Sequence, residues 1–567
     1  MLDALLRKGR QVAADPVLRR WLALRLLGRV RGEPAFVAHR PPYLGAGWSG
    51  LDAETPSLSF PEMASGDEPS ASIALSLSLP GETVTVVPGR ETALFERSFA
   101  DTETLLAVHR FAWLPLLGDG VSPGWVARLW RAWAERFATP SDGWPWHPYT
   151  AAERVINLLD FAARHGLPAP VGETTRVLAL HGPAIAARLE YFGEHHTSNH
   201  LSNNGRGLYR LGLALGMERC AATGLAILLE EARRLFRPSG VLREGSSHYH
   251  LLLTRNYLDA WLTARAHHRP EEGDLRRIAG RALAVVPRLG LPGGLPLIGD
   301  ISPDCPPSFL TSLLGGGGGG GLELRDACEP VPDDLPVPDD LLVADGWLDG
   351  RFGPWSGLWH ASPEGWSHMP GHGHQDCGGF ELHFGDEPLF VDLGRGSYGE
   401  TGFFDVSGLA HNIVTIDGAD PYPPNRPYYD DAFRHAVGGP PPRLRREADG
   451  VSLTHRGFGR LRRVGEVERR WRFIGPTLRL DERVDGLGRH VVRRLLHTPL
   501  AVEPLTDGAM LRGRERTWRL RVEDRADIVL RPATRWTAYG VGHPATTIDI
   551  GVEATLPWRG RLTVTAE

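Results

Sequence analysis

The spacing of apolar residues changes near residue 345 of the chain. From about residue 90 to 300, apolar side chains recur every three to four positions in one segment after another, for example in 125–137, 151–165 and 224–236. This is the period of an amphipathic helix, and proline, glycine, serine and threonine stand at the boundaries, where helices start and stop. Because no long strands separate these segments, the helices must bury their apolar faces on one another, which predicts a helical bundle or toroid.

After residue 345 the period becomes two. Apolar and polar residues alternate in 380–394, 412–418, 467–475 and 561–567, with turn residues between the runs. Alternation of this kind is typical of strands that have one buried face and one wet face. The second half is therefore predicted to be an antiparallel β-sandwich, and the whole chain a multidomain α+β protein.

Low-complexity sequence separates the two halves. Gly315 to Gly321 is an unbroken glycine run, and 329–340 is rich in proline and aspartate, so both are interpreted as linker. A phosphate-binding loop is disfavoured, because no strand precedes the glycines and no Gly-Lys-Ser/Thr follows them. The predicted organisation is an N-terminal helix with short strands (1–90, the strands within 71–87), a helical domain (91–314), a linker (315–344) and a sandwich (345–567).

Composition narrows the class of protein. The chain has 567 residues, enough for two or three domains, and its 42% hydrophobic and 23% charged residues are ordinary for a globular protein. Its 63 basic and 68 acidic residues give a net charge of −5 without a basic stripe, so nucleic acid is not an expected partner. Cys220, Cys305, Cys328 and Cys377 lie far apart without a Cys-x-x-Cys pair, which argues against disulfides or a thiolate zinc site.

The N-terminal segment 1–30 has basic residues but no uninterrupted apolar stretch and no small-residue cleavage site. It is predicted to be an amphipathic helix rather than a signal peptide. The sequence has no apolar run of about 18 residues, so no membrane span is expected. These patterns predict a cytoplasmic protein, or a periplasmic one if the start codon is misassigned, and they leave the oligomeric state open.

Candidate chemistry concentrates in the segment 371–376, which reads GHGHQD. It places His372 and His374 one residue apart, and residues two apart on an extended strand point to the same face. Asp392 and His411 follow at predicted strand ends, which completes a supply of nitrogen and oxygen ligands suited to zinc. One imidazole can hold a metal while the other does chemistry. In a chain with 23 histidines, however, an isolated His-x-His is weak evidence by itself.

Two helix starts in the helical half carry polar residues. Asn199 and His200 stand at the head of a helix whose remaining turns are small and apolar, and His248, Tyr249 and His250 open another helix about fifty positions later. Both polar ends can face one cleft. Each also has a purely structural reading, since Asn199 is a good N-cap residue and a tyrosine at a helix start commonly packs with its hydroxyl wet.

In their order along the chain, these motifs resemble the heparinase II/III family of polysaccharide lyases, which includes heparin, heparan and alginate lyases. The resemblance covers most of residues 90–420, and its specific part is the order and spacing of the last three motifs. The motifs are Asn199-His200, Arg243-Glu244-Gly245-Ser246 with Tyr249-His250, GHGHQD, FVDLG at 390–394 and AHN at 410–412, with WPWHPYTAAERVINLLDF at 144–161 as weaker support. The resemblance implies an (α/α) toroid in front of a β-sandwich, with the active cleft between them.

The resemblance also implies a reaction, β-elimination at a uronic acid, in which a base removes the proton from carbon 5 and the oxygen at carbon 4 leaves protonated. Asn199 would neutralise the sugar carboxylate, as an oxyanion hole does, and His200 would lie beside it as a base or an orienting donor. Tyr249 would act as base, acid or both. A free tyrosine has a pKa of about 10, so as a base it needs a cationic or hydrogen-bonding neighbour. His372 would be the second proton-transfer residue.

By the same resemblance, His374, Asp392 and His411 would hold a zinc ion. Three protein ligands leave an open position, which elsewhere marks a catalytic zinc. The resemblance favours a structural role instead, in which the ion stiffens the strands that carry His372. The implied partner is an anionic polysaccharide substrate, and glycosaminoglycan, alginate and bacterial exopolysaccharide all offer uronate units.

Two features depart from the family. Most relatives carry an export signal, which segment 1–30 lacks, so an internal or biosynthetic substrate is expected, and the glycine run 315–321 lies beside the expected cleft. Two other function classes stay open. One is a non-catalytic carbohydrate-binding or exopolysaccharide-assembly protein. The other is a glycoside hydrolase with a carboxylate pair, for which Glu194, Glu244 and Asp376 are available without forming a convincing pair in the sequence.

Overall fold

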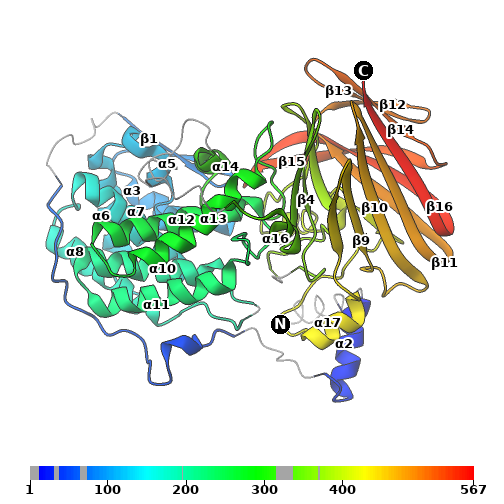
Figure 1. Ribbon diagram of the computed structural model, residues 1–567. Helices are drawn as coiled ribbons and strands as arrows, with labels where there is room; N and C mark the ends of the chain where they lie inside the picture. The colour runs from blue at the N-terminus through cyan, green and yellow to red at the C-terminus, as the bar shows by residue number, and fades with distance from the viewer. Residues whose placement is uncertain are drawn as a thin grey trace.

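Two halves of different secondary structure lie side by side in the protein (Figure 1). The computed structural model describes residues 12–13, 15–30, 37–63, 73–194, 196–314, 336–367 and 371–567. Helices dominate up to residue 314 and strands from residue 347. The predicted fold, a helical toroid followed by an antiparallel β-sandwich, is confirmed.

Amphipathic helices pack their apolar faces together in the first half. They are α3 (Glu91–Glu96), α4 (Thr102–Arg110), α5 (Trp113–Leu117), α6 (Pro123–Phe137), α7 (Pro148–His165), α8 (Val171–Ala179), α9 (His181–Ala186), α10 (Asn199–Leu215), α11 (Glu218–Leu235), α12 (Ser247–Ala266), α13 (Glu272–Leu289) and α14 (Pro307–Leu310). The small residues of α10 allow α11 to approach closely, since a Cβ on Gly212 would lie 2.3 Å from the Ala221 backbone nitrogen. The predicted helical segments 125–137, 151–165 and 224–236 correspond to α6, α7 and α11.

Two antiparallel sheets make up the second half. The smaller has the order β3 (Trp347–Phe352), β4 (Trp355–His360), β5 (Gly379–Phe384) and β6 (Glu387–Phe390). The strands of the larger are β7 (Val414–Ile416), β8 (Arg443–Glu447), β9 (Gly450–His455), β10 (Val464–Ile474), β11 (Thr477–Thr498), β12 (Ala501–Leu505), β13 (Gly508–Arg512), β14 (Thr517–Val522), β15 (Asp527–Ala538) and β16 (Val541–Ala566). They run in the order β12-β13-β14-β16-β11-β10-β9-β8, with β15 paired to β16 and β7 to β11.

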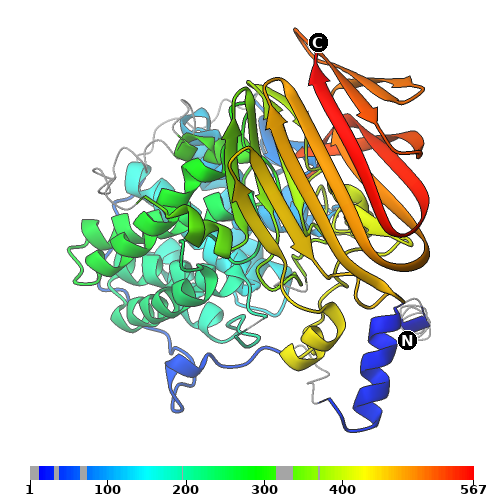
Figure 2. The ribbon, with the colours of Figure 1, turned by 45° about the vertical axis from the view of Figure 1, so that its right-hand side comes forward.

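The sandwich core is rich in aromatic residues. Trp471 and Phe473 of β10 point inward and meet Trp359 and Trp355 of the small sheet, with ring centroids 6.0 and 5.7 Å apart. Since side chains alternate between the faces of a strand, the residues between them point away from this core. The outer face of the large sheet is therefore a separate surface (Figure 2).

The described part of the predicted region 1–90 is divided between the two halves. Helix α2 (Pro16–Leu26) packs on the sandwich beside α17 (Asp431–Gly438), with the rings of Trp21 and Tyr428 4.5 Å apart. Residues 37–63 follow the helical half instead, where His39 forms a β-bridge with Tyr191. The short strands predicted within 71–87 are present as β1 (Leu75–Leu79) and β2 (Glu82–Val86), an antiparallel pair.

A shared apolar cluster joins the halves. Trp347 and Leu358 of the small sheet are buried together with Val285 of α13 and residues of α12. Polar contacts border this cluster, and the Arg288 guanidinium forms two hydrogen bonds with Asp349, at 2.9 and 2.6 Å. Part of the predicted linker is helical, as α16 (Asp339–Ala344), whereas the glycine run lies outside the described residues.

Two further predictions concern thiols and membranes. Cys220, Cys305 and Cys377 are buried free thiols, as expected, and Cys328 falls outside the described residues. None of the helices within the described ranges has the length and apolar character that a bilayer crossing requires.

Candidate active site

A cavity of about 250 Å³ lies where the helical half meets the sandwich. Its walls come from both halves: Glu103, Arg110, Tyr149, His200, Tyr249, Pro303 and Asp304 from one, and Gly371, His372, Arg395 and Tyr398 from the other. Three residues singled out by the sequence, His200, Tyr249 and His372, therefore meet across the junction.

The start of α12 positions Tyr249. Ser246 is the N-cap residue, and its hydroxyl oxygen accepts a hydrogen bond from the Tyr249 backbone N–H at 3.0 Å while donating to the Asp300 carbonyl at 2.7 Å. Before Asp300 comes Gly299, with a φ of +82°, and a Cβ there would stand 2.5 Å from the Gly245 carbonyl oxygen, so only glycine fits. One serine thus ties the helix that carries Tyr249 to the backbone that carries Asp300.

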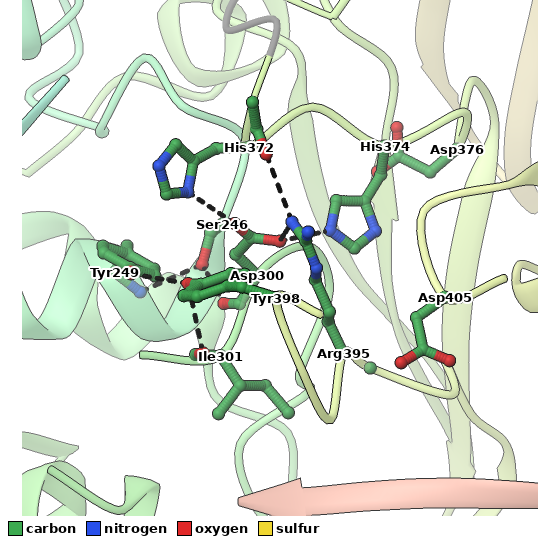
Figure 3. Close-up of polar contacts among 12 residues, drawn as sticks. Ser246, Tyr249, Asp300, Ile301, His372, His374, Asp376, Arg395, Tyr398 and Asp405 are labelled. Carbon is green, nitrogen blue, oxygen red and sulfur yellow. Dashed lines mark hydrogen bonds and ion pairs between the residues drawn. The ribbon is translucent and has the colours of Figure 1, made fainter. Parts of the chain in front are cut away.

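Asp300 is the centre of the polar network at the cavity (Figure 3). Its Oδ2 accepts a hydrogen bond from His372 Nδ1 at 2.6 Å, and its Oδ1 accepts from His374 Nε2 at 2.7 Å and Arg395 Nη1 at 2.9 Å. Burial alone would raise the pKa of Asp300, but the Arg395 charge and the two imidazole hydrogen bonds hold it far below its usual range. The ionised carboxylate accepts a hydrogen bond from the Nδ1–H group of His372 and leaves Nε2 as the nitrogen that can accept a proton.

The segment that carries the two histidines is irregular, so the predicted extended strand is wrong. Residues 371–376 form a turn and a loop between β4 and β5, outside either sheet. Gly371 and Gly373 favour such a conformation, and the imidazole bonds to Asp300 hold it in place of a β-ladder. His372 and His374 still reach the same carboxylate, so their convergence does not depend on a strand.

Two tyrosines face each other in the cavity. The hydroxyl oxygens of Tyr249 and Tyr398 are 2.7 Å apart, and the ring centroid of His372 lies 5.9 Å from that of Tyr249 and 5.6 Å from that of Tyr398. Burial, and after it the Asp300 charge, raises the pKa of both phenols well above 10. The cation beside the pair, Arg395, lies over the Tyr398 ring at 4.4 Å. Tyr249 is therefore a neutral phenol in this network rather than a phenolate.

His200 borders the cavity on the helical side. Its Nδ1 is 2.8 Å from Glu190 Oε1, and its ring centroid is 4.5 Å from that of Tyr149. Burial alone would lower the pKa of His200, but the Glu190 carboxylate raises it. Burial alone would likewise raise the pKa of Glu190, and His200 lowers it. The two side chains form an ion pair.

A second cation stands in the helical wall. Arg110 Nη1 donates to Asp304 Oδ1 at 2.8 Å and to Glu103 Oε2 at 3.1 Å, and its guanidinium carbon lies 4.8 Å from the centre of the Tyr149 ring. Tyr149 donates its hydroxyl proton to the other oxygen of Asp304. Arg110 is thus fixed by two carboxylates at the edge of the cavity.

Asn199 is not among the residues that line the cavity. It begins α10 and is buried, and its backbone N–H donates to Glu244 Oε1 at 3.1 Å. Among the described residues, neither its amide oxygen nor Glu244 Oε2 has a hydrogen-bond partner. The role of Asn199 at a sugar carboxylate stays a prediction.

The predicted zinc ligands are close together, but they are linked in a row by hydrogen bonds instead of surrounding one point. His374 Nδ1 and His411 Nε2 are 3.2 Å apart, and Asp392 Oδ2 lies 2.7 Å from the other ring nitrogen of His411, where a carboxylate orients a histidine. His374 Nε2 is taken by Asp300. In the described ranges, no three His, Cys, Asp or Glu side chains are placed to hold one ion. The residues do not fit a three-ligand zinc site as they stand, and zinc stays a prediction.

Three residues of this network were missed by the sequence analysis. Arg395 directly follows the FVDLG motif and Tyr398 stands three residues further on, so their position near it was a usable signal, whereas Asp300 has no motif of its own. The acids considered for hydrolysis, Glu194, Glu244 and Asp376, are all absent from the cavity lining.

Comparison with known proteins agrees with the predicted resemblance. Residues 346–560 match the family described as "Heparinase II/III-like, C-terminal". No curated protein matches the chain. The fold is similar to that of a crystal structure of heparinase III, with a TM-score of 0.64 and 15% identity over 83% of this chain and 78% of that one.

Two other solved structures are also similar. A further heparinase III gives a TM-score of 0.57 and 14% identity, covering 97% of this chain and 91% of that one. The heparan sulfate lyase HepC from Pedobacter heparinus gives 0.55 and 16%, covering 85% and 79%. At such identities the likeness shows the fold, and the chemistry must be argued from this chain's own residues.

Proposed function

We propose that the protein is a polysaccharide lyase, because residues 346–560 match the heparinase II/III-like C-terminal family and the fold is similar to that of heparinase III. The proposed substrate is an anionic polysaccharide that contains uronic acid, cleaved by β-elimination. The observation that carries the proposal is the meeting of His372, bonded to an ionised Asp300, and a neutral Tyr249 in one cavity between the two halves.

His372 is the proposed base. Its Nδ1 proton is held by Asp300, so Nε2 has the free electron pair that removes the proton from carbon 5 of the uronate. The Asp300 carboxylate then stabilises the imidazolium, as a buried aspartate does in a Ser-His-Asp triad. The electrons of the broken C–H bond form the double bond between carbons 4 and 5.

Tyr249 is the proposed acid. As the bond between carbon 4 and the bridging oxygen breaks, its hydroxyl proton passes to that oxygen, which leaves as an alcohol. The Tyr398 hydroxyl, 2.7 Å away, donates a hydrogen bond to the phenolate that results. Transfer of the His372 proton back to Tyr249 restores both groups for the next turnover.

The substrate carboxylate needs a positive or hydrogen-bonding partner, because its charge grows as carbon 5 loses the proton. Arg395 and Arg110 line the cavity and supply fixed cations. The proposal keeps Asn199 in the predicted role of amide donor. It also keeps the predicted zinc at His374, Asp392 and His411 only as a structural support, on which no proton transfer depends, and metal analysis of the purified protein tests this.

Product release from uronate polymers tests the proposal. Alginate, heparin and chondroitin sulfate are incubated with the full-length protein, and ultraviolet absorbance reports new unsaturated ends. Tyr249→Phe should lower the rate about a hundredfold or more, because general acid catalysis is lost. Tyr257→Phe is the matched control, since Tyr257 is a buried tyrosine of the same helix whose hydroxyl bonds to the Leu228 carbonyl, outside the cavity.

Other outcomes point to the competing functions. Saturated sugar ends without ultraviolet absorbance would indicate a hydrolase. Binding without any product would indicate a carbohydrate-binding protein. An unchanged rate in Tyr249→Phe would remove this residue from the proposed mechanism.

A further inference from the structure

A second hollow, separate from the cavity, lies on the large sheet. Its volume is about 490 Å³, and β10, β11, β16 and the turn after β14 form its walls. It is called the arginine groove here, after the arginines that line it: Arg470, Arg472, Arg479, Arg483, Arg559 and Arg561.

The arginine groove lies on the outer face of the sandwich. Arg470 and Arg472 alternate along β10 with Trp471 and Phe473, which are buried against the small sheet. The groove therefore opens on the face of the large sheet that points away from the small sheet. The small sheet lies between the large sheet and the helical half. In both views, the C-terminal part of β16, to which Arg559 and Arg561 belong, lies on the side of the sandwich away from the helices (Figures 1 and 2). None of its residues lines the catalytic cavity.

Its charge is positive in a chain whose net charge is −5. Six arginines share the groove with five carboxylates, but two of these, Glu482 and Asp524, face the buried Arg494. Arg494 forms two hydrogen bonds with Asp524, at 2.8 and 2.9 Å. Three carboxylates of the lining, from Glu468, Asp481 and Glu523, remain beside the six guanidinium groups, and Glu447 and Asp485, outside the lining, pair with Arg470 and Arg483.

The β-ladder places like charges directly opposite each other. Arg472 stands across from Arg479, and Arg483 across from Arg559, an arrangement that destabilises a sheet. Arg479 is paired with Asp481 and Arg483 with Asp485. Within the described part of the chain, Arg472 and Arg559 have no ion pair, and the buried Arg472 Nε has no hydrogen-bond partner. Such a local conflict is characteristic of functional sites.

The spacing of the two unpaired arginines indicates the size of the ligand. Arg472 and Arg559 are separated by two strand spacings and, along the strands, by four residues. Standard sheet dimensions make these offsets about 10 Å and about 13 Å. A single small anion cannot bridge them, whereas an extended polymer with spaced anionic groups can.

The lining also indicates the kind of polymer. No aromatic side chain lines the groove, so it offers no stacking platform for nucleic-acid bases. Its three remaining carboxylates would repel a closely charged phosphate backbone, but they can accept hydrogen bonds from sugar hydroxyls. Guanidinium groups bind carboxylate and sulfate groups through paired hydrogen bonds.

We propose that the arginine groove is a second, non-catalytic binding site for an anionic polysaccharide chain. The identity of the polymer rests on the proposed function, whereas the site itself rests on the groove. The protein would then bind the polymer far from the bond that is cut. A polysaccharide bound in the groove is kept at high effective concentration near the cavity.

Binding measurements with the full-length protein test the site. All variants carry Tyr249→Phe, so that the polymer is not consumed, and the Kd for alginate and for heparin is measured at low and physiological salt. The pair Arg472→Gln and Arg559→Gln should weaken binding about tenfold or more, since each removes a charge-assisted contact. The control pair is Arg489→Gln and Arg512→Gln, two exposed sandwich arginines paired with Glu553 and Glu503. It removes the same charge and should change the Kd by less than about twofold.

Melting curves separate lost binding from lost folding. Because the groove substitutions remove opposed like charges, the double variant should melt no lower than its parent. If it unfolds, Arg559→Gln alone provides the test, as this side chain is exposed at the end of the groove.

Three results would overturn the inference: an unchanged Kd in the groove variant, equal weakening in both pairs, or tighter groove-dependent binding of single-stranded DNA or anionic lipid vesicles. Failure of the proposed function is distinguishable from these. If the wild-type protein releases no unsaturated ends, yet the groove variant binds the polymer more weakly than its parent, the lyase is refuted and the binding site stands.

Discussion

Asp300 accepts hydrogen bonds from three nitrogen groups with two oxygen atoms, and this shared carboxylate would prepare His372 for its proposed role as a base. The bond to Nδ1 fixes the tautomer, while Arg395 and His374 keep the carboxylate ionised and immobile. None of this follows from the histidines alone. The sequence analysis identified His372 and Tyr249 from their motifs, but the partner that sets their chemistry lies about 70 residues away from one and 50 from the other.

Asp300→Asn tests the tautomer directly. The amide keeps the size of the side chain but can donate a proton to Nδ1, which would then place the ring proton on Nε2 and block the base. The kcat should fall on the order of a thousandfold or more, as it does when a triad aspartate is replaced by asparagine, while the KM changes little. Steady-state kinetics on the best uronate polymer provide the measurement, and a loss confined to the KM would contradict the assigned role.

The Glu190–His200 ion pair predicts a pH-dependent stability. The pKa of His200 is raised, so its contribution is complete below about pH 6.5 and is lost as the pH rises through the raised value. The pKa of Glu190 is lowered, so its contribution is present above about pH 4.5 and is lost on acidification. The pair therefore stabilises the fold most at mildly acidic pH.

Melting temperatures of the wild type and His200→Gln, measured from about pH 5 to 9, check this expectation. The difference between them should be largest near pH 5.5 and shrink toward pH 9. Glu190→Gln should follow the same course, since either change removes the pair. The His200 side chain is 34% exposed, so solvent screening keeps the effect modest. A difference that stays constant with pH would exclude an ion pair.

At the scale of elements, the helices and most strands could be predicted because burial imposes their period on the sequence. The segments 151–165 and 467–475 became α7 and β10 for this reason. The segment 371–376 failed the same reasoning, since its conformation is set by contacts with Asp300, not by a sheet. The spacing of apolar residues indicates only which face of an element is buried, so it cannot predict a loop whose conformation is fixed by a distant side chain.

Ser246→Ala tests the link between helix α12 and the Asp300 backbone. Loss of the N-cap should lower the free energy of unfolding by about 1 kcal/mol, and loss of the second bond, to the Asp300 carbonyl, should also lower the kcat. Ser122→Ala is the matched control, because Ser122 caps α6 through the Trp125 N–H and has no bond to the site. Denaturant unfolding and kinetics of both variants provide the measurement. Equal kinetic effects would show that the link to Asp300 is unimportant.

At the scale of the whole molecule, the cavity exists only because the two halves are held together. One connection runs through Tyr539, whose hydroxyl donates to Asp101 of the helical half at 2.9 Å and accepts from the Tyr398 backbone N–H at 3.0 Å. The sequence could predict both halves separately. It could not predict this seam, because the residues that form it carry no shared motif and are hundreds of positions apart.

Tyr539→Phe should therefore affect catalysis more than stability. Removal of the hydroxyl costs about 1 kcal/mol of folding free energy, and it frees the backbone of Tyr398 beside Tyr249. We expect a kcat lowered roughly three- to tenfold. Tyr422→Phe, which removes a hydroxyl bonded to the Pro440 carbonyl inside the sandwich, is the comparison. A Tyr539→Phe enzyme with normal kcat would show that the seam does not need this bond.

Helix α2 packs on the sandwich, whereas residues 37–63 follow the helical half. The polypeptide therefore passes between the halves twice, once before residue 37 and once after residue 314. Two chain connections restrict the hinge opening of the halves that a single connection would permit. A long sugar chain would then reach Tyr249 and His372 by entering along the junction between the halves. The width of that entrance, rather than opening of the two halves, would decide which polymers bind.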